Sequence, residues 1–247
     1  MYTHHRFDHE FPPGTEVRCT YAICSVPRSG SSLLSELLCL SGVAGAPTEY
    51  FDPEQCARFS EAWETDGLDA YLAALVAKKT SPNGVFGLKV HYDQMAEMLG
   101  GRDLLDLFDD LRCIYIRRSD HVSQAVSYAI AIQTNQWAST HEATARASFD
   151  RTQIDDLLRQ IERDEQRWER WFVEHDISPL RIEYDALVAD RVRVVGEVLQ
   201  HLAIDPPGRP LEDLTPTLTR QADRRSRRWA LRYRALPTSP RPARRER

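Results

Sequence analysis

The chain has 247 residues, of which 42% are hydrophobic and 28% charged, and its formal net charge is −5. This apolar content is too high for a disordered chain and is sufficient for the core of one large or two small domains. The charge is divided unevenly, because residues 220–247 hold eleven arginines and two acidic residues, a net charge of +9, which leaves −14 on residues 1–219. An acidic body with a basic end argues against a protein that coats nucleic acid.

Strand-like and helix-like segments alternate along the chain. The predicted strands span residues 18–24, 85–90, 112–116 and 179–184. The predicted helices span residues 33–42, 53–64, 68–79, 95–99, 121–137, 150–175 and 187–202. Such alternation predicts βαβ units and an α/β fold with a mainly parallel central sheet flanked by helices. We expect a flexible arm at 1–16, one domain at 17–235 and a disordered basic tail at 236–247.

The five cysteines are odd in number and form no C-x-x-C pair: Cys19, Cys24, Cys39, Cys56 and Cys113. This pattern predicts reduced thiols rather than a disulfide framework or a structural zinc site. No apolar run approaches the ~18 residues that a membrane span needs, and the polar N-terminus lacks the apolar segment of a signal peptide. We therefore expect a cytoplasmic protein.

The first strand is followed by a short turn rich in hydrogen-bond donors, Pro27-Arg28-Ser29-Gly30-Ser31-Ser32. Gly30 lets the backbone turn tightly, so that amide groups at the start of the next helix face an anion, and Arg28 and the serine hydroxyls add donors. The turn lacks the lysine of a nucleoside-triphosphate loop and the three glycines of a dinucleotide loop. The alternative is that the Ser-Gly-Ser sequence only caps a helix.

A second group of donors follows the third strand. Arg117 and Arg118 stand at the strand end, and Ser123 and Ser127 lie one turn apart on the next helix, which Asp120 is expected to cap. Arginine suits tetrahedral oxyanions, although these arginines could instead pair with nearby aspartates on the surface. Since both turns lie at the same sheet edge, together they favour a nucleotide with two separated phosphates.

Five sequence blocks, in order between about residues 20 and 234, resemble the bacterial trehalose 2-sulfotransferase family: PRSGSSLL, GVAGAPTEYF, GVFGLKVHYDQ, RRSDHVSQAVSYAIAIQTNQW and RQADRRSRRW. The resemblance implies a P-loop-like three-layer α/β fold and a sulfotransferase. It implies 3′-phosphoadenosine 5′-phosphosulfate (PAPS) as the donor, no metal, and a small-molecule acceptor with a hydroxyl, such as a carbohydrate, a glycolipid or a secondary metabolite. A homodimer is also expected from it.

The resemblance also implies roles for individual residues. The 5′-phosphosulfate is expected at the first turn, on Arg28, Ser29, Gly30, Ser31 and Ser32. The 3′-phosphate is expected on Arg118, with Arg117, Ser123 and Ser127 as helpers. A basic segment that begins at Arg220 is expected to close over the nucleotide, with Arg220 as a further contact to the 3′-phosphate.

Transfer of the sulfuryl group resembles phosphoryl transfer, in which catalysis relies on positioning and on stabilisation of charge. It also needs a base that accepts the proton of the acceptor hydroxyl. Glu49 is the first candidate for the base, since it takes the place of the family's carboxylate. His91 is the second, because it lies where other sulfotransferases carry a catalytic histidine. Lys89 is expected to stabilise charge on the leaving oxygen, or else to form a surface ion pair. Gln133 and Trp137 are candidate substrate-binding residues, although Trp137 could equally be a core residue.

Two other functions remain open from the sequence. A nucleoside-triphosphate kinase could use the same fold, but its lysine and an acidic magnesium ligand after a strand are missing. A nucleic-acid-binding or regulatory module could use the basic end, but that end offers only Trp229 and Tyr233 for base stacking.

Overall fold

The computed structural model describes residues 9–108, 110–218 and 224–236. Four parallel strands form one sheet in the order β2-β1-β3-β4. The strands are β1 (Cys19–Ser25), β2 (Val85–His91), β3 (Arg112–Arg117) and β4 (Leu180–Glu183). The predicted parallel sheet and its four strands are confirmed.

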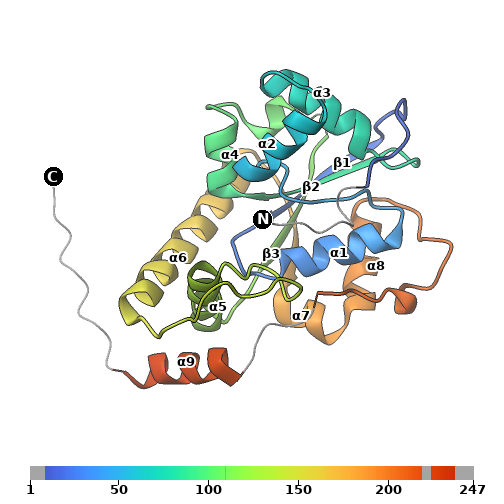
Figure 1. Cartoon of the computed structure of the whole chain (residues 1–247). Helices are drawn as coiled ribbons and strands as arrows, with labels where there is room; N and C mark the ends of the chain where they lie inside the picture. Colours follow the sequence, from blue (N-terminus) through green and yellow to red (C-terminus); the bar gives the residue numbers. More distant parts are fainter. Residues whose placement is uncertain (1–8, 109, 219–223, 237–247) are drawn as a thin grey trace.

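Helices cover both faces of this sheet (Figure 1). They are α1 (Ser31–Ser41), α2 (Pro53–Ala62), α3 (Leu68–Lys79), α4 (Tyr92–Met98), α5 (His121–Thr134), α6 (Arg151–Glu174), α7 (Tyr184–Ala189), α8 (Arg191–His201) and α9 (Arg224–Ala235), with short 3-10 turns η1 (Leu104–Asp106) and η2 (Leu211–Asp213).

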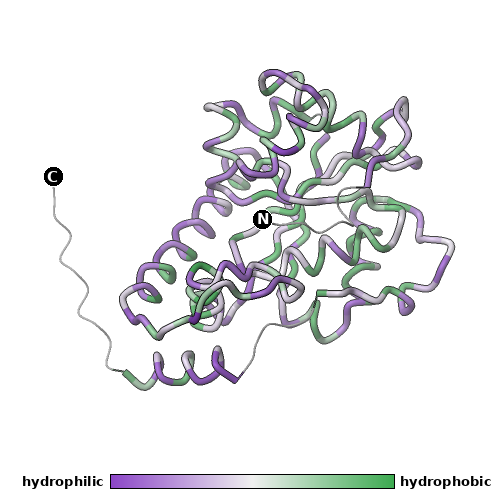
Figure 2. Tube along the Cα trace, viewed as in Figure 1, coloured by the Kyte–Doolittle hydropathy of each residue, from purple (hydrophilic) through white to green (hydrophobic). Residues whose placement is uncertain are grey.

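Each face of the sheet has its own core. Alternate strand residues such as Ile23 and Ile114 pack with Leu34 of α1 and Val195 of α8. The strand residues that alternate with these belong to the second core, to which α2 to α6 and Trp229 of α9 also contribute. Figure 2 shows hydrophobic residues along the central strands and hydrophilic residues along much of α6 and α9. The three-layer α/β fold is therefore as predicted.

The parallel register brings the carboxyl ends of the strands to one edge. Ser25 of β1 is paired with His91 of β2 and with Ile116 of β3, and Arg117 of β3 is paired with Glu183 of β4. The segments that follow these four residues therefore begin side by side, which is where ligands bind in sheets of this kind.

Two predicted helices need correction, and one helix was not predicted. The helix expected at 187–202 is two helices, α7 and α8, because Asp190 has non-helical angles (φ −148°, ψ 81°) and caps α8 by accepting from the Arg193 amide at 3.0 Å. The helix expected to reach residue 137 ends at Thr134, since Asn135 is left-handed (φ 53°). The arginine-rich segment at 224–235 forms α9, which was not predicted.

The N-terminal arm is partly fixed to the domain. Residues 1–8 lie outside the described residues, but the Phe11 amide donates to the Lys78 carbonyl at 2.8 Å and Lys79 Nζ donates to the His9 carbonyl at 2.9 Å. Glu10 is also 3.1 Å from Lys78 Nζ. Residues 9–11 are therefore held against the end of α3. In the described parts of the chain, no helix combines the length and apolar character that a membrane crossing requires.

Candidate active site

The turn between β1 and α1 contains two left-handed residues, Arg28 (φ 66°) and Gly30 (φ 95°). Gly30 is required for a second reason, because a Cβ atom there would lie 2.3 Å from Cδ2 of Tyr184. The side chain of Gln124, fully buried in α5, donates to the Pro27 carbonyl at 2.8 Å and holds the turn from the other side. The turn is thus fixed between α5 and α7 at the start of α1.

A cavity of about 300 Å³ opens over this turn. Of the residues predicted for the site, its wall includes Arg28, Gly30, Ser31, Ser32, Arg118, Ser123, Ser127 and Trp137. The wall also includes residues that the sequence did not predict for the site: Tyr184, Arg191, Pro216, Leu218, Ser226 and Arg227. The two predicted anion-binding turns therefore contribute to the same cavity.

Four arginines among the described residues line the cavity, and the positions of two of them, Arg28 and Arg118, are fixed by contacts with other residues. Arg28 Nε donates to Ser127 Oγ at 3.1 Å, and its terminal nitrogen donates to the Trp137 carbonyl. Arg118 is only 9% exposed, and its guanidinium lies 5.0 Å from the centroid of the Tyr184 ring. Because Tyr184 also packs on Gly30, one ring connects the first turn to the second. Two fixed guanidinium groups in one cavity can bind an anion with more than one charged group.

Three predicted residues are placed elsewhere. Arg117 turns away and forms an exposed ion pair with Glu183 at 2.6 Å, and it is not in the described wall of the cavity. Gln133 donates to Gln153 at 2.7 Å and lies in a separate open hollow between α5 and the start of α6. The side chain of Ser29 is fully buried, and it is not in the described wall of the cavity.

The predicted base and its two predicted neighbours form one cluster beside the cavity. Glu49 Oε1 lies 2.5 Å from Lys89 Nζ and 3.6 Å from His91 Nε2. Glu49 Oε2 accepts a hydrogen bond of 2.8 Å from Gln94, a residue that the sequence analysis did not single out. The other ring nitrogen of His91, Nδ1, is 3.0 Å from the Ser25 carbonyl oxygen, so the imidazole is held at the ends of β1 and β2.

Lys89 joins this cluster to the anion-binding turn. Its side chain is 2% exposed, and Nζ donates to Ser32 Oγ at 3.0 Å while it contacts Glu49. Burial alone raises the pKa of the Glu49 carboxyl, but the charges of Lys89 and His91 and their hydrogen bonds outweigh it and hold that pKa well below its ordinary value. Glu49 is therefore ionised at neutral pH.

Buried tyrosines hold the loop that carries Glu49. The hydroxyl of Tyr50 donates to the Ala46 carbonyl at 2.5 Å, and the hydroxyl of Tyr71 in α3 donates to the Tyr50 carbonyl at 2.7 Å. The Lys89 amide donates to the Thr48 carbonyl at 2.8 Å, so the loop also pairs with the edge of β2. Because these hydrogen bonds fix the carbonyl groups on both sides of Glu49, the loop holds Glu49 in one position.

Asp120 connects the second turn to α9. Its carboxylate accepts from the Ser123 amide at 3.0 Å, which confirms the predicted cap, and also from Ser123 Oγ and Arg234 at 2.6 Å each. Burial raises the pKa of Asp120, but the hydrogen bonds from Ser123 and Arg234 outweigh it and lower the pKa. The predicted contact Arg220 lies outside the described residues.

The described residues contain no group of three or more His, Cys, Asp or Glu side chains that could hold a metal ion. The residues that gather at the cavity are instead arginines, serines and a lysine, which are donors for an anionic ligand.

Comparisons with known proteins agree with this chemistry. The chain is 31% identical to the trehalose 2-sulfotransferases of Mycolicibacterium smegmatis and Mycobacterium tuberculosis, with 87% of this chain and 94% of each relative aligned. Among solved structures, the sulfotransferase domain of the Synechococcus PCC 7002 olefin synthase is similar in fold, with a TM-score of 0.51 and 17% identity over 92% of this chain and 91% of that domain.

The sequence model of the Stf0 sulphotransferase family matches residues 20–236, which include the sheet from the second residue of β1 onward and both turns that form the cavity. This match does not favour the kinase alternative. The chain therefore belongs to the Stf0 sulphotransferase family and is an enzyme that transfers a sulfuryl group.

Proposed function

We propose that this enzyme takes the sulfuryl group from PAPS and transfers it to a hydroxyl of a small, carbohydrate-containing acceptor, with Glu49 as the base. The observation that carries the proposal is the position of Lys89, whose Nζ atom contacts both Glu49 and Ser32. This contact places a carboxylate that accepts protons directly beside a turn built to bind a phosphate or phosphosulfate group.

The residues of the cavity fit a nucleotide with phosphates at two positions. Gly30 is the N-cap of helix α1, and the positive end of the helix dipole favours an anion there, next to Ser31 and Ser32. Arg118, with Ser123 and Ser127, forms the second binding position on the same wall. Arg227 of α9 adds another positive charge. The proposal assigns the 5′-phosphosulfate to the first group and the 3′-phosphate to the second.

The proposed chemistry divides between the donor and the residues of this chain. Bound PAPS supplies the sulfuryl group that becomes attached to the acceptor oxygen. Glu49 accepts the proton of the acceptor hydroxyl, for which it must be ionised, and its lowered pKa provides this. Lys89 keeps Glu49 charged and places a positive charge beside Ser32, where the negative charge of the leaving phosphate is expected. His91 and Gln94 hold the carboxylate in position.

The acceptor class is supported by the relatives and by one wall of the cavity. Both curated relatives carry the name trehalose 2-sulfotransferase. Trp137 lies in the wall, and its ring is 6.0 Å from that of Tyr128. Aromatic rings of this kind commonly contact the apolar faces of sugars. The proposal also includes a homodimer, supported by the family resemblance, and a cytoplasmic location, supported by five cysteines that all lie in the described residues and form no disulfide bond.

A transfer assay with ³⁵S-labelled PAPS tests this function. The purified chain is incubated with trehalose, glucose, a trehalose glycolipid and a simple phenol, and the labelled products are separated. We expect transfer to at least one sugar-containing acceptor and none to the phenol. Transfer to the phenol alone, or transfer of phosphate from γ-³²P-labelled ATP, would contradict the proposal.

A further inference from the structure

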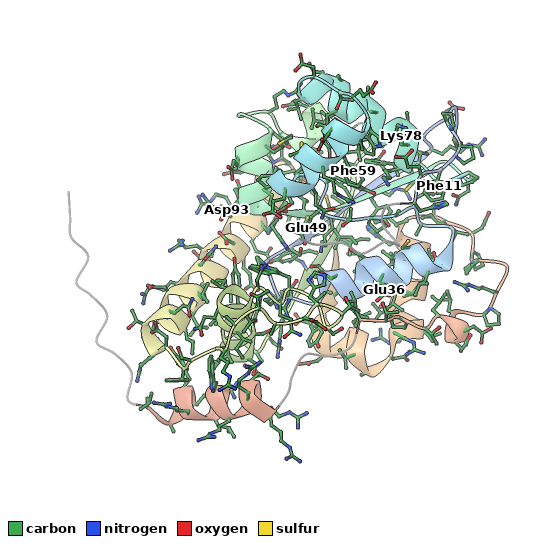
Figure 3. All side chains as sticks on the ribbon, viewed as in Figure 1. Phe11, Glu36, Glu49, Phe59, Lys78 and Asp93 are labelled. Atoms are coloured by element: carbon green, nitrogen blue, oxygen red, sulfur yellow. The ribbon has the colours of Figure 1, made fainter. Side chains whose placement is uncertain are left out.

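Helix α1 carries a buried carboxylate that binds a distant part of the chain. Glu36 is fully buried, and it is labelled on α1 in Figure 3. Its Oε1 atom accepts from the Thr217 amide at 2.8 Å and from Thr217 Oγ1 at 2.6 Å, while Oε2 accepts from the Leu218 amide at 2.9 Å. These three donors come from one short segment about 180 positions further along the sequence.

A carboxylate at this position needs an explanation beyond packing. A buried charge is costly unless hydrogen bonds compensate for it, and an apolar side chain would fill the same space at lower cost. Two of the three donors are backbone amides of consecutive residues, so the carboxylate fixes the path of the main chain there. Glu36 therefore holds residues 217–218 against α1 in one defined position.

The segment that Glu36 holds is part of the cavity wall. Pro216 and Leu218 line the cavity on either side of Thr217, and Ser226 and Arg227 of α9 line it after the next few residues. The far end of α9 is fixed separately, because Arg234 donates to Asp120 at 2.6 Å and Tyr233 donates to Asp155. Glu36 lies on the same helix whose first turn forms another part of the wall.

We propose that Glu36 is a positioning residue for donor binding: it aligns the 216–218 wall with the start of α1, so that both contact the same nucleotide. This inference rests on the proposed use of PAPS. Glu36 itself touches no reacting atom, and it acts through Pro216 and Leu218. Its removal should therefore raise the KM for PAPS and leave the chemical step almost unchanged.

The main test is the variant Glu36→Gln, which keeps the shape of the side chain. Its amide NH₂ group would face a backbone N–H, so at least one charge-assisted bond is lost, and we expect the KM for PAPS and the Kd for adenosine 3′,5′-bisphosphate to rise roughly 10-fold. At saturating PAPS, kcat and the KM for the acceptor should stay within about 2-fold of the wild-type values. The matched control is Glu212→Gln, an exposed acid in the same C-terminal region, which should change none of these constants.

A second variant guards against a misfolded Glu36→Gln protein. Thr217→Val keeps the buried carboxylate and both backbone donors but removes the hydroxyl bond, so it should fold and raise the KM for PAPS by a smaller factor, roughly 3-fold. Changing both residues should have less effect than the product of the two single changes, because they share one bond. Wild-type constants in Thr217→Val, or a lowered kcat with unchanged KM in Glu36→Gln, would overturn the proposal.

A measurement without nucleotide separates this proposal from the proposed function. Trypsin cleavage at the arginines of α9 should be at least about 5-fold faster in Glu36→Gln than in Glu212→Gln, because the segment before α9 is no longer held. Equal cleavage rates would overturn the role of Glu36 even if the wild-type enzyme binds the nucleotide. Failure of the wild-type enzyme to bind the nucleotide, with faster cleavage in Glu36→Gln, would instead overturn the proposed use of PAPS.

Discussion

The Nζ atom of Lys89 lies 2.5 Å from Oε1 of Glu49, in a pair whose side chains are 2% and 18% exposed. The same Nζ atom donates to Ser32 Oγ, so a lysine from β2 is shared between the carboxylate and the turn between β1 and α1. In the view of Figure 3, Glu49 is labelled between α2 and α1. Removing one partner of a buried pair leaves the other charge uncompensated, which makes this pair sensitive to substitution.

Lys89→Met should shift the acidic limb of the pH–rate profile to higher pH. With Lys89 present, the pKa of Glu49 is lowered, so the base stays ionised into the acid range. Without Lys89, only His91 remains to oppose the effect of burial, and the pKa rises. The measurement is kcat/KM between pH 4.5 and 8. Lys78→Met, which removes an exposed lysine paired with Glu10, is the control and should leave the profile unchanged. An acidic limb at the same pH in Lys89→Met would show that Glu49 is not the group that titrates.

Glu49→Gln should lower kcat by about 10²- to 10⁴-fold, the usual contribution of a general base. The affinity for adenosine 3′,5′-bisphosphate should stay within about 3-fold, because Glu49 is not in the described wall of the cavity. Steady-state kinetics and calorimetry measure the two quantities. Glu54→Gln changes a nearby exposed acid of α2 and should keep full activity. Full activity in Glu49→Gln would move the role of base to His91.

Arg118→Ala should weaken binding of adenosine 3′,5′-bisphosphate by at least about 10-fold, since a nearly buried guanidinium in the cavity wall is lost. Arg117→Ala should change it by less than about 3-fold, because that side chain forms an exposed pair with Glu183. The two variants differ by one position in the sequence, so they control for each other in the same titration. Equal losses in both would contradict the assignment of Arg118 to the nucleotide.

Gly30→Ala should destabilise the fold by about 1–3 kcal/mol more than Gly42→Ala. Both glycines are left-handed (φ 95° and 75°), so both substitutions carry the same kind of backbone strain. Only at position 30 does the new methyl group collide with the Tyr184 ring, whereas no described atom lies within 4 Å of it at position 42. Urea denaturation measures the difference, and equal midpoints would mean that Tyr184 moves aside without cost.

The sequence predicted the sheet and the anion-binding turns because both depend on local patterns. The strands are short apolar runs, and the turns carry arginine and serine at their ends, so parallel order alone brings them to one edge. The role of Glu49 as the base was predicted through the family resemblance, since nothing local distinguishes Glu49 from Glu54. Gln94 could have been found from its position three residues after His91, where it completes a capping box.

Other features depend on contacts between distant segments. No local pattern separates Arg117 from Arg118, which only the family resemblance ranked first, and their different surroundings follow from the pairing of Arg117 with Glu183 on β4. Glu36 reads as an ordinary helical acid until Thr217 and Leu218 are placed beside it. The basic segment 224–235 lacks a strong apolar pattern, and its helix is stabilised by packing of Trp229 on Phe149 and by the bond from Arg234 to Asp120.

The central claim is that the cavity beside Glu49 binds a nucleotide with phosphates at the 5′ and 3′ positions. Calorimetry of the wild-type chain with adenosine 3′,5′-bisphosphate and with ADP tests it most directly, because the two ligands carry the same number of phosphates in different places. We expect adenosine 3′,5′-bisphosphate to bind at least about 10-fold more tightly, through Arg118 and its neighbours. Equal affinity for the two, or tighter binding of ADP, would contradict the claim.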